Sequence, residues 1–288
     1  MIRKKFYVIF CKSLLVCVFA VMVIGACSGV GVIRGIIASA PTIDDIVATP
    51  TGFLSTVLDA NGNQTATLVA SGSNRRAVTI DEIPKNLQHA FVAIEDERFY
   101  EHNGIDVTGI IRAGVKGVAS GFHFSEGAST ITQQLLKNTV FTSWTSESSM
   151  ADKFERKFQE QYLALQLEKV VDKDWILENY LNAINLGQNT LGVGVASERY
   201  FGKDVSDLTL SECAVLAAIT QNPSKYNPIT NPQENSKRRM KVLNNMKDQG
   251  YISQEEYDEA VADNVYDRIQ LVNIESETNR ICYFLFCR

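Results

Sequence analysis

Glu95 opens an acidic run whose residue types suit proton transfer. The run reads Glu95-Asp96-Glu97-Arg98-Phe99-Tyr100-Glu101-His102-Asn103-Gly104. Apolar residues precede it at the spacing of one helix face, at Leu87, Phe91 and Ile94. A carboxylate that points towards the core is costly unless it has a partner or a task, so Glu95 is a candidate general base. A solvated helix end is the ordinary alternative, and it applies to Glu97 and Glu101.

A second polar segment contains hydroxyls, amides and a lysine. It reads Gly127-Ala128-Ser129-Thr130-Ile131-Thr132-Gln133-Gln134-Leu135-Leu136-Lys137. Gln133 and Lys137 are one helical turn apart and can contact the same ligand, while Ser129 or Thr130 can cap the helix. Such a helix start suits an anion, for example a diphosphate. An ordinary polar helix face explains the same spacing.

A third segment, Arg156-Lys157-Phe158-Gln159-Glu160, lies within a predicted helix over residues 151–169. One side of this helix is apolar at Phe154, Phe158, Tyr162 and Leu165, and the opposite side carries Leu163 and Leu167 with Arg156 and Glu160. A helix that is apolar on both sides is predicted to be central to its domain. Arg156 and Glu160 form either an i,i+4 ion pair or part of a cleft with a second carboxylate and cations.

Two carboxylates in one cleft are the usual equipment for chemistry at a sugar anomeric carbon. The added cations favour a phosphate leaving group. A hydrolase does not need these cations. These residues therefore favour a transferase that uses a lipid diphosphate. A muramidase or lytic transglycosylase is the alternative, and a non-catalytic membrane scaffold is a third hypothesis that the complete set of charged residues disfavours.

The elements that position these residues are predicted to be almost wholly helical. From Pro84 onward the pattern is helical, with further helices over 106–119, 130–139, 151–169 and 173–186, the last ending before Gly187. Thr209 and Ser253 each begin a capping box. Before this body, Ser55–Leu58 and Gln64–Val69 flank Asn61-Gly62 and predict a short β-hairpin.

The N-terminus predicts a membrane anchor. Arg3-Lys4-Lys5 precedes an uncharged stretch from Ser13 to Ile33, about the 20 residues that cross a bilayer as a helix. The basic flank should stay in the cytoplasm, which places the remainder outside the cytoplasmic membrane. A cleaved signal peptide is the alternative, and Cys27 ends a segment that resembles a lipoprotein cleavage site.

Composition excludes other classes of function. The net charge of -5 argues against nucleic acid as a partner, because phosphate backbones attract basic proteins. Three scattered histidines and six cysteines without a Cys-x-x-Cys spacing give no transition-metal site. Cys282 and Cys287 can pair, but nothing in the pattern requires it.

The three polar segments, in this order, resemble the signature of the penicillin-binding-protein glycosyltransferases, the peptidoglycan polymerases of glycosyltransferase family 51. The pattern E-D-x-x-F-x-x-H-x-G is matched at Glu95, Asp96, Phe99, His102 and Gly104. The pattern G-x-S-T-I-T-Q-Q is complete over 127–134, and R-K-x-x-E is matched at Arg156, Lys157 and Glu160. Two further family motifs resemble residues 173–203 and 208–228.

The resemblance implies a lysozyme-like, mostly α head lobe and a smaller jaw lobe that contacts the membrane. It also implies that lipid II is polymerised into β-1,4-linked glycan strands. The 4-hydroxyl of an acceptor lipid II attacks the anomeric carbon of the growing lipid-linked glycan with inversion, and undecaprenyl diphosphate leaves. The implied partners are these substrates, the bacterial cytoplasmic membrane and cell-wall synthesis proteins.

Carried over by position, the resemblance makes Glu95 the general base and places Glu160 on the donor side. There Glu160 would help to hold the diphosphate, or an Mg²⁺ or Mn²⁺ ion that the diphosphate binds. The implied substrate-binding residues are Arg112, Ser129, Gln133, Gln134, Lys137, Arg156 and Lys157, and the implied supporting residues are Asp96, Phe99, His102 and Gly104. The family's membrane-dipping jaw corresponds to the region of Phe122, Phe124, Phe141 and Trp144.

Four segments are expected along the chain. They are the basic flank and anchor over 1–37, a tether and hairpin over 38–79, the glycosyltransferase domain over 80–250, and a helical extension over 251–288. The extension resembles a truncated link to a transpeptidase. We expect no transpeptidase here, because the sequence contains no Ser-x-x-Lys, Ser-Asp-Asn or Lys-Thr-Gly motif.

Overall fold

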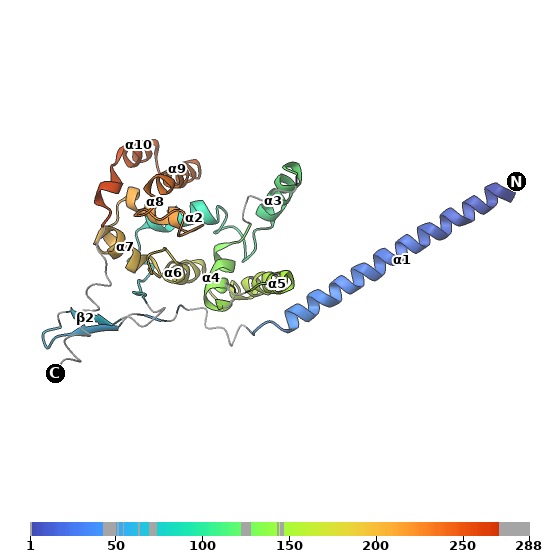
Figure 1. Cartoon of the computed structure of the whole chain (residues 1–288), viewed down its shortest axis with the longest axis horizontal. Coiled ribbons are helices and arrows are strands. Elements are labelled where there is room, and N and C mark those ends of the chain that lie inside the picture. The colour runs from blue at the N-terminus through green and yellow to red at the C-terminus, as the bar shows by residue number, and fades with distance from the viewer. Residues whose placement is uncertain are drawn as a thin grey trace.

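The computed structural model is mostly helical, as the sequence predicts (Figure 1). It describes residues 2–42, 50, 52–53, 55–62, 64–68, 74–121, 128–142, 144 and 147–270. The helices are α1 (Ile2–Ala38), α2 (Lys85–Glu95), α3 (Val107–Ala119), α4 (Ile131–Thr139), α5 (Met150–Leu167), α6 (Lys173–Ala183), α7 (Val193–Phe201), α8 (Leu210–Ile219), α9 (Pro232–Asp248) and α10 (Gln254–Ala262), with single 3-10 turns η3 (Val205–Asp207) and η4 (Val265–Arg268).

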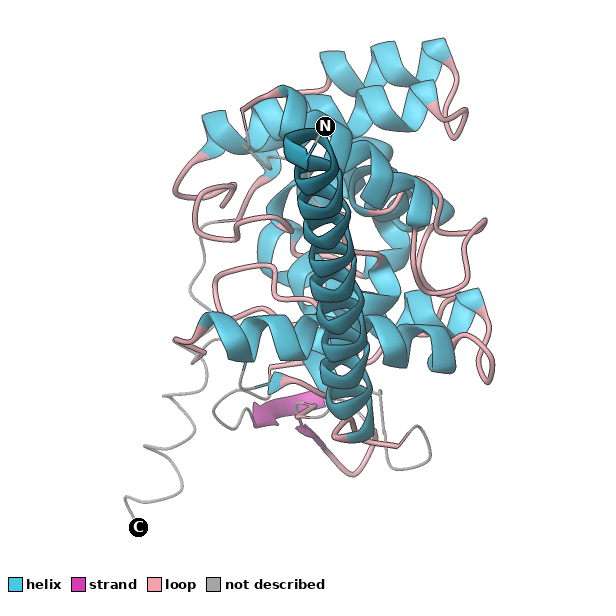
Figure 2. Cartoon of the chain, turned by 90° about the vertical axis from the view of Figure 1, so that its right-hand side faces the viewer, coloured by secondary structure: helices cyan, strands magenta, loops and turns pink. Residues whose placement is uncertain are grey.

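Helix α1 projects away from the body in Figure 1, and in the view turned by 90° it lies in front of the body (Figure 2). Its segment Lys12–Ala38 is long and apolar enough to cross a membrane. Among the described contacts, those at the C-terminal end of the helix connect it to the body. There the Gln159 side chain of α5 donates to the Ile36 carbonyl at 3.2 Å and to the Ser39 hydroxyl at 3.0 Å. The anchor helix therefore ends on the helix that carries Arg156 and Glu160.

The predicted hairpin is present. Strands β1 (Ser55–Leu58) and β2 (Gln64–Leu68) pair antiparallel, and Gly62 in the connection has a φ of 84°, which favours glycine. Val69, the last residue of the predicted second strand, lies outside the described residues.

Helix α8 forms the centre of the body. Every residue from Ser211 to Ile219 is buried, as expected for a helix that is covered on all sides. Helix α2 packs against both α8 and α9, and α4 packs against α5 and α6. The predicted capping boxes at Thr209 and Ser253 are both formed and begin α8 and α10. Helices far apart in sequence thus bring the ends of α2, α4 and α8 together.

Two sequence predictions were wrong. Helix α6 ends at Ala183 rather than at residue 186, because the Asn185 side chain accepts from the Gly187 amide and starts a turn in which Gly187 has a φ of 78°. Helix α5 is not covered on both sides: Phe154 is 54% exposed and Leu165 40% exposed, whereas Glu160 is buried. The side that packs is the one carrying the charged residues.

Candidate active site

Glu95 is the last residue of α2 and lines a cleft of about 520 Å³. Its side chain is 13% exposed. One carboxylate oxygen accepts from the Gln134 amide at 3.0 Å. The other accepts from the Thr220 hydroxyl and lies 3.5 Å from the Arg238 guanidinium. The carboxylate is thus held by three helices while it remains open to the cleft.

The orientation of the Gln134 amide is fixed by Tyr180. The phenol of this buried residue on α6 donates to the Gln134 carbonyl oxygen at 3.4 Å. The amide nitrogen of Gln134 is therefore the atom that meets Glu95. Burial is the first cause that holds the pKa of Tyr180 above its ordinary value, so its hydroxyl stays a donor.

Asp96 connects Glu95 to the second motif. Its buried carboxylate accepts from the Ile131 backbone amide at 2.9 Å, at the free N-terminal end of α4. The same carboxylate lies 3.0 Å from the His102 ring nitrogen. Thr130 caps α4, as the sequence allowed, by accepting from the Gln133 amide. Asp96 thereby fixes the start of the helix that carries Gln134.

Phe99 and Gly104 complete the support beneath the acidic run. Phe99 is fully buried. Gly104 has a φ of 92°, and a Cβ atom built there would lie 2.5 Å from the Ala164 carbonyl oxygen of α5. The Gly104 carbonyl accepts from the Thr130 hydroxyl at 2.7 Å. The absent side chain lets the first two motifs and α5 meet closely.

Glu160 lies in a second charged cluster beside the cleft. It is 1% exposed, and its two oxygens meet Arg156 and, at 3.1 Å, the Lys157 ammonium. Lys157 also donates to the Ser129 hydroxyl at 2.8 Å. Ser129 lines the same cleft as Glu95. The i,i+4 ion pair that the sequence allowed is formed, and Ser129 joins it to the cleft.

Two donor groups of α4, the Gln133 amide and the Lys137 ammonium, lie at this cluster. The Gln133 side-chain nitrogen is buried without a partner among the described residues. Lys137 lies one turn further along α4, with its ammonium 4.4 Å from the centre of the Trp144 ring. Burial is the main cause that lowers the pKa of Lys137, although the charge of Glu160 opposes it. Arg156 is already paired with Glu147 at 2.8 Å.

Arg112 occupies the outer side of the cleft on α3. Its side chain is 45% exposed and pairs with Glu97 at 3.0 Å. Both residues line the same cleft as Glu95. The structure therefore brings Glu95, Gln134, Ser129 and Arg112 to one cleft, whereas Gln133, Lys137, Arg156, Lys157 and Glu160 do not line it but form the adjacent cluster.

Sequence reasoning missed the partners of Glu95 that come from the second half of the chain. Thr220 is the C-cap of α8, and Arg238 is on α9. Lys241, Asn245 and Asp248 of α9 and its C-cap Gln249 also line the cleft. Arg238 lies in the basic sequence Lys237-Arg238-Arg239, and the sequence alone does not show which of these three cations reaches the site. Only the contact of α2 with α9 selects it.

Glu160, the expected metal ligand, is paired with two cations in this structure. Its two oxygens are occupied by cations, and it is buried. A divalent ion needs several oxygen ligands, and no group of three or more acidic, histidine or cysteine side chains suitable for one occurs in the described part of the chain. An Mg²⁺ or Mn²⁺ ion shared between Glu160 and the substrate diphosphate stays a prediction.

The expected aromatic jaw is described only in part. Phe122 and Phe124 lie outside the described residues, Phe141 packs against the core, and Trp144 is 37% exposed. An apolar surface that the sequence analysis did not single out is present on α3. Its exposed residues lie one turn apart, and each is more than 60% exposed: Val107, Ile111, Val115 and Val118.

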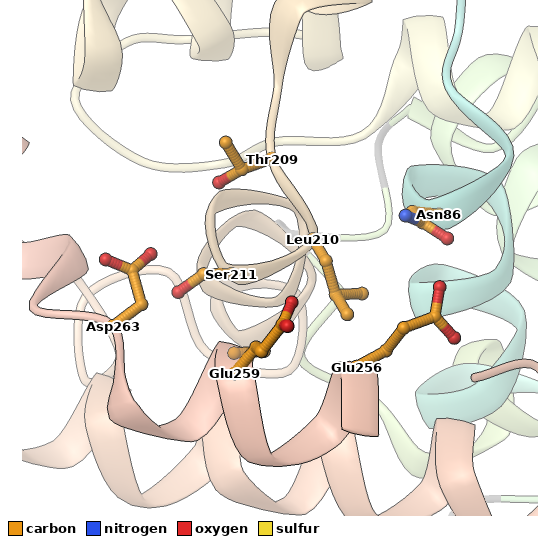
Figure 3. Close-up of a pocket in the computed structure, with 8 residues that line it drawn as sticks. Asn86, Thr209, Leu210, Ser211, Glu256, Glu259 and Asp263 are labelled. Carbon is orange, nitrogen blue, oxygen red and sulfur yellow. The ribbon is translucent and has the colours of Figure 1, made fainter. Parts of the chain in front are cut away.

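A second pocket, of about 340 Å³, lies at the N-terminal end of α8 (Figure 3). Its carboxylates come from α10 and the residue after it, and two of them have partners: Glu256 accepts from the Ser253 amide, and Asp263 pairs with Arg268. It contains none of the predicted site residues. Since Thr220 is at the other end of α8, the two pockets are about 15 Å apart along that helix.

The comparisons with known proteins agree with the motif pattern. The family described as transglycosylase matches residues 61–247. Penicillin-binding protein 1A of Clostridium perfringens strain 13 is 43% identical over 260 residues, which cover 88% of this chain and 36% of that protein. Penicillin-binding protein 1F of Bacillus subtilis strain 168 is 47% identical over 203 residues, which cover 70% of this chain and 27% of that protein.

Among solved structures, penicillin-binding protein 1A from Haemophilus influenzae matches 83% of this chain and 25% of that chain, with 23% identity and a TM-score of 0.44. The chain thus spans about a third of the length of the curated relatives it matches. The family match covers well over half of the chain and confirms the resemblance carried by the motifs. The chain belongs to the transglycosylase family.

Proposed function

We propose that this chain is a peptidoglycan glycosyltransferase that polymerises lipid II into β-1,4-linked glycan with inversion and release of undecaprenyl diphosphate. The observation that carries the proposal is the placement of Glu95. The Glu95 carboxylate lies in an open cleft and is held by Gln134, Thr220 and Arg238. Ser129 lines the same cleft and connects it to the charged cluster by its hydrogen bond with Lys157.

In the proposed reaction Glu95 accepts the proton of the acceptor 4-hydroxyl. The freed electron pair of that oxygen forms the bond to the donor anomeric carbon, and the bond from that carbon to the phosphate oxygen breaks. The diphosphate leaves with the bonding electrons. Lys157 and Lys137 offset its charge, and the free Gln133 amide can donate to it. Inversion follows because base and leaving group lie on opposite sides of the sugar.

The proposed substrate is linked to a membrane lipid, so the protein is expected to contact the membrane through α1 and α3. Helix α1 anchors the chain with its basic flank in the cytoplasm and the body outside. The exposed Val107, Ile111, Val115 and Val118 of α3 form an apolar face that can enter the lipid interface. Arg112 lies on the same helix and lines the cleft, which supports a site at the membrane surface.

The test is incubation of the purified full chain with labelled lipid II and separation of the products by length. We expect long glycan from the wild-type protein and none from Glu95→Gln. Glu101→Gln is the matched control, because Glu101 lies in the same acidic run but is exposed and does not line the cleft. Equal polymerisation by Glu95→Gln would remove Glu95 as the base.

The lytic alternative is tested by incubating the same protein with finished peptidoglycan in place of lipid II. Release of muropeptides from finished peptidoglycan, without turnover of lipid II, would replace the proposal with a lytic transglycosylase or muramidase. Binding of lipid II without formation of glycan or muropeptides would support the non-catalytic scaffold. Partners among cell-wall synthesis proteins stay a prediction.

A further inference from the structure

One face of α9 forms a wall of the cleft beyond Glu95. Arg238, Lys241, Asn245 and Asp248 all line the cleft and follow one another at intervals of three and four residues, which places them on one side of the helix. Arg238 is at the Glu95 end. The face therefore leads from the proposed base along the cleft.

Two residues on this face carry opposite charges that nothing in the described part of the chain neutralises. Lys241 and Asp248 are exposed and make no hydrogen bond or ion pair with another described residue. They are seven residues apart, which is about 10 Å along a helix. Other charged residues of the cleft are paired, for example Arg112 with Glu97. A cation and an anion are thus available to a ligand.

Two amide side chains next to these charges make the wall polar. The Asn245 amide donates to the Ala93 carbonyl at 2.9 Å, and the Gln249 amide donates to the same carbonyl at 3.1 Å. The Gln249 side-chain oxygen is buried without a partner among the described residues, so it can accept from an N–H group. A peptide offers such a donor.

We propose that this face of α9 binds the peptide of the acceptor substrate, with a peptide carboxylate at Lys241 and a peptide ammonium group at Asp248. The inference rests on the proposed function, which puts the acceptor hydroxyl at Glu95. Three extended residues span about 10 Å, and a peptide with a diamino acid carries both charges. A sugar carries neither, and a diphosphate is repelled by Asp248.

The test uses an acceptor-limited reaction, in which preformed lipid-linked glycan is the donor in excess and monomeric lipid II is varied. We expect acetylation of the free amine of the monomer to raise KM about fivefold with kcat unchanged, the range of a solvent-exposed ion pair. In Asp248→Asn both monomers should show the higher KM. Amidation of the peptide carboxylate should raise the KM of the wild-type protein in the same way. In Lys241→Gln the amidated and unmodified monomers should have the same, higher KM.

The control variants are Asp258→Asn on α10 and Lys237→Gln at the start of α9, which are exposed and outside the cleft. Both should keep the fivefold preference. A preference that persists in Asp248→Asn, or that is absent from the wild-type protein while glycan is made, overturns this inference alone. Failure to make glycan from any monomer overturns the proposed function as well.

Discussion

Replacement of Gly104 by alanine tests the close contact between the acidic run and α5. The new Cβ would meet the Ala164 carbonyl oxygen at 2.5 Å and its carbon at 2.6 Å, on a backbone with a φ of 92°. The unfavourable φ costs about 1–3 kcal/mol, and overpacking adds about 1–3 kcal/mol. A midpoint near 4 kcal/mol lowers the Tm of a domain of this size by about 8–16 °C.

The assay is thermal unfolding of the full chain in detergent, followed by circular dichroism. Gly114→Ala is the matched control, because Gly114 lies inside α3 with no atom within 4 Å of the added Cβ. It should raise the Tm slightly, since alanine favours a helix over glycine by about 0.5–1 kcal/mol. A Gly104→Ala protein that unfolds within about 2 °C of wild type would refute the reasoning.

Three further predictions concern the site and the membrane. Arg238→Gln should lower kcat/KM for lipid II about tenfold without a matching loss of Tm, because a charged partner of Glu95 is removed. Burial lowers the pKa of Lys137, so wild-type activity should fall at a lower alkaline pH than that of Lys137→Arg, which stays charged. Stability has the opposite dependence, since the unfolded chain binds the extra proton and the wild-type protein gains stability as pH rises through the folded pKa; chemical denaturation at several pH values checks it. In bilayers, an environment-sensitive dye on Ile111→Cys should show a blue-shifted emission, whereas the same dye on Asp258→Cys should not; equal spectra would argue against membrane contact by α3.

The local structure around the site could be predicted because it depends on short-range patterns. The spacing of Leu87, Phe91 and Ile94 correctly placed Glu95 on the inner side of α2, and a hydroxyl before Ile131 correctly predicted the cap of α4. The capping boxes at Thr209 and Ser253 were equally local. Each of these features involves residues within about two helical turns.

The long-range features of the site could not be predicted in this way. Thr220 contacts a carboxylate 125 positions earlier, and no periodicity encodes that contact. The exposed apolar side of α5 shows the same limit: Phe154 and Leu165 have the spacing of a core face, and a membrane protein can leave such a face to lipid. Periodicity finds an apolar face but does not say what covers it.

The contact between Arg156 and Glu147 has a consequence for ligand selection. Glu147 precedes α5 and holds the Arg156 guanidinium at 2.8 and 3.0 Å, while Glu160 holds the same side chain from the other direction. Two carboxylates thus already balance Arg156 and Lys157, and Lys137 adds a further cation to the cluster. A monovalent anion gains little by displacing Glu147, whereas a ligand with two adjacent phosphates exchanges one negative charge for several. If the leaving group is the proposed diphosphate, this cluster would favour it over a monovalent anion, because only a ligand with two phosphates compensates for the displaced Glu147 carboxylate.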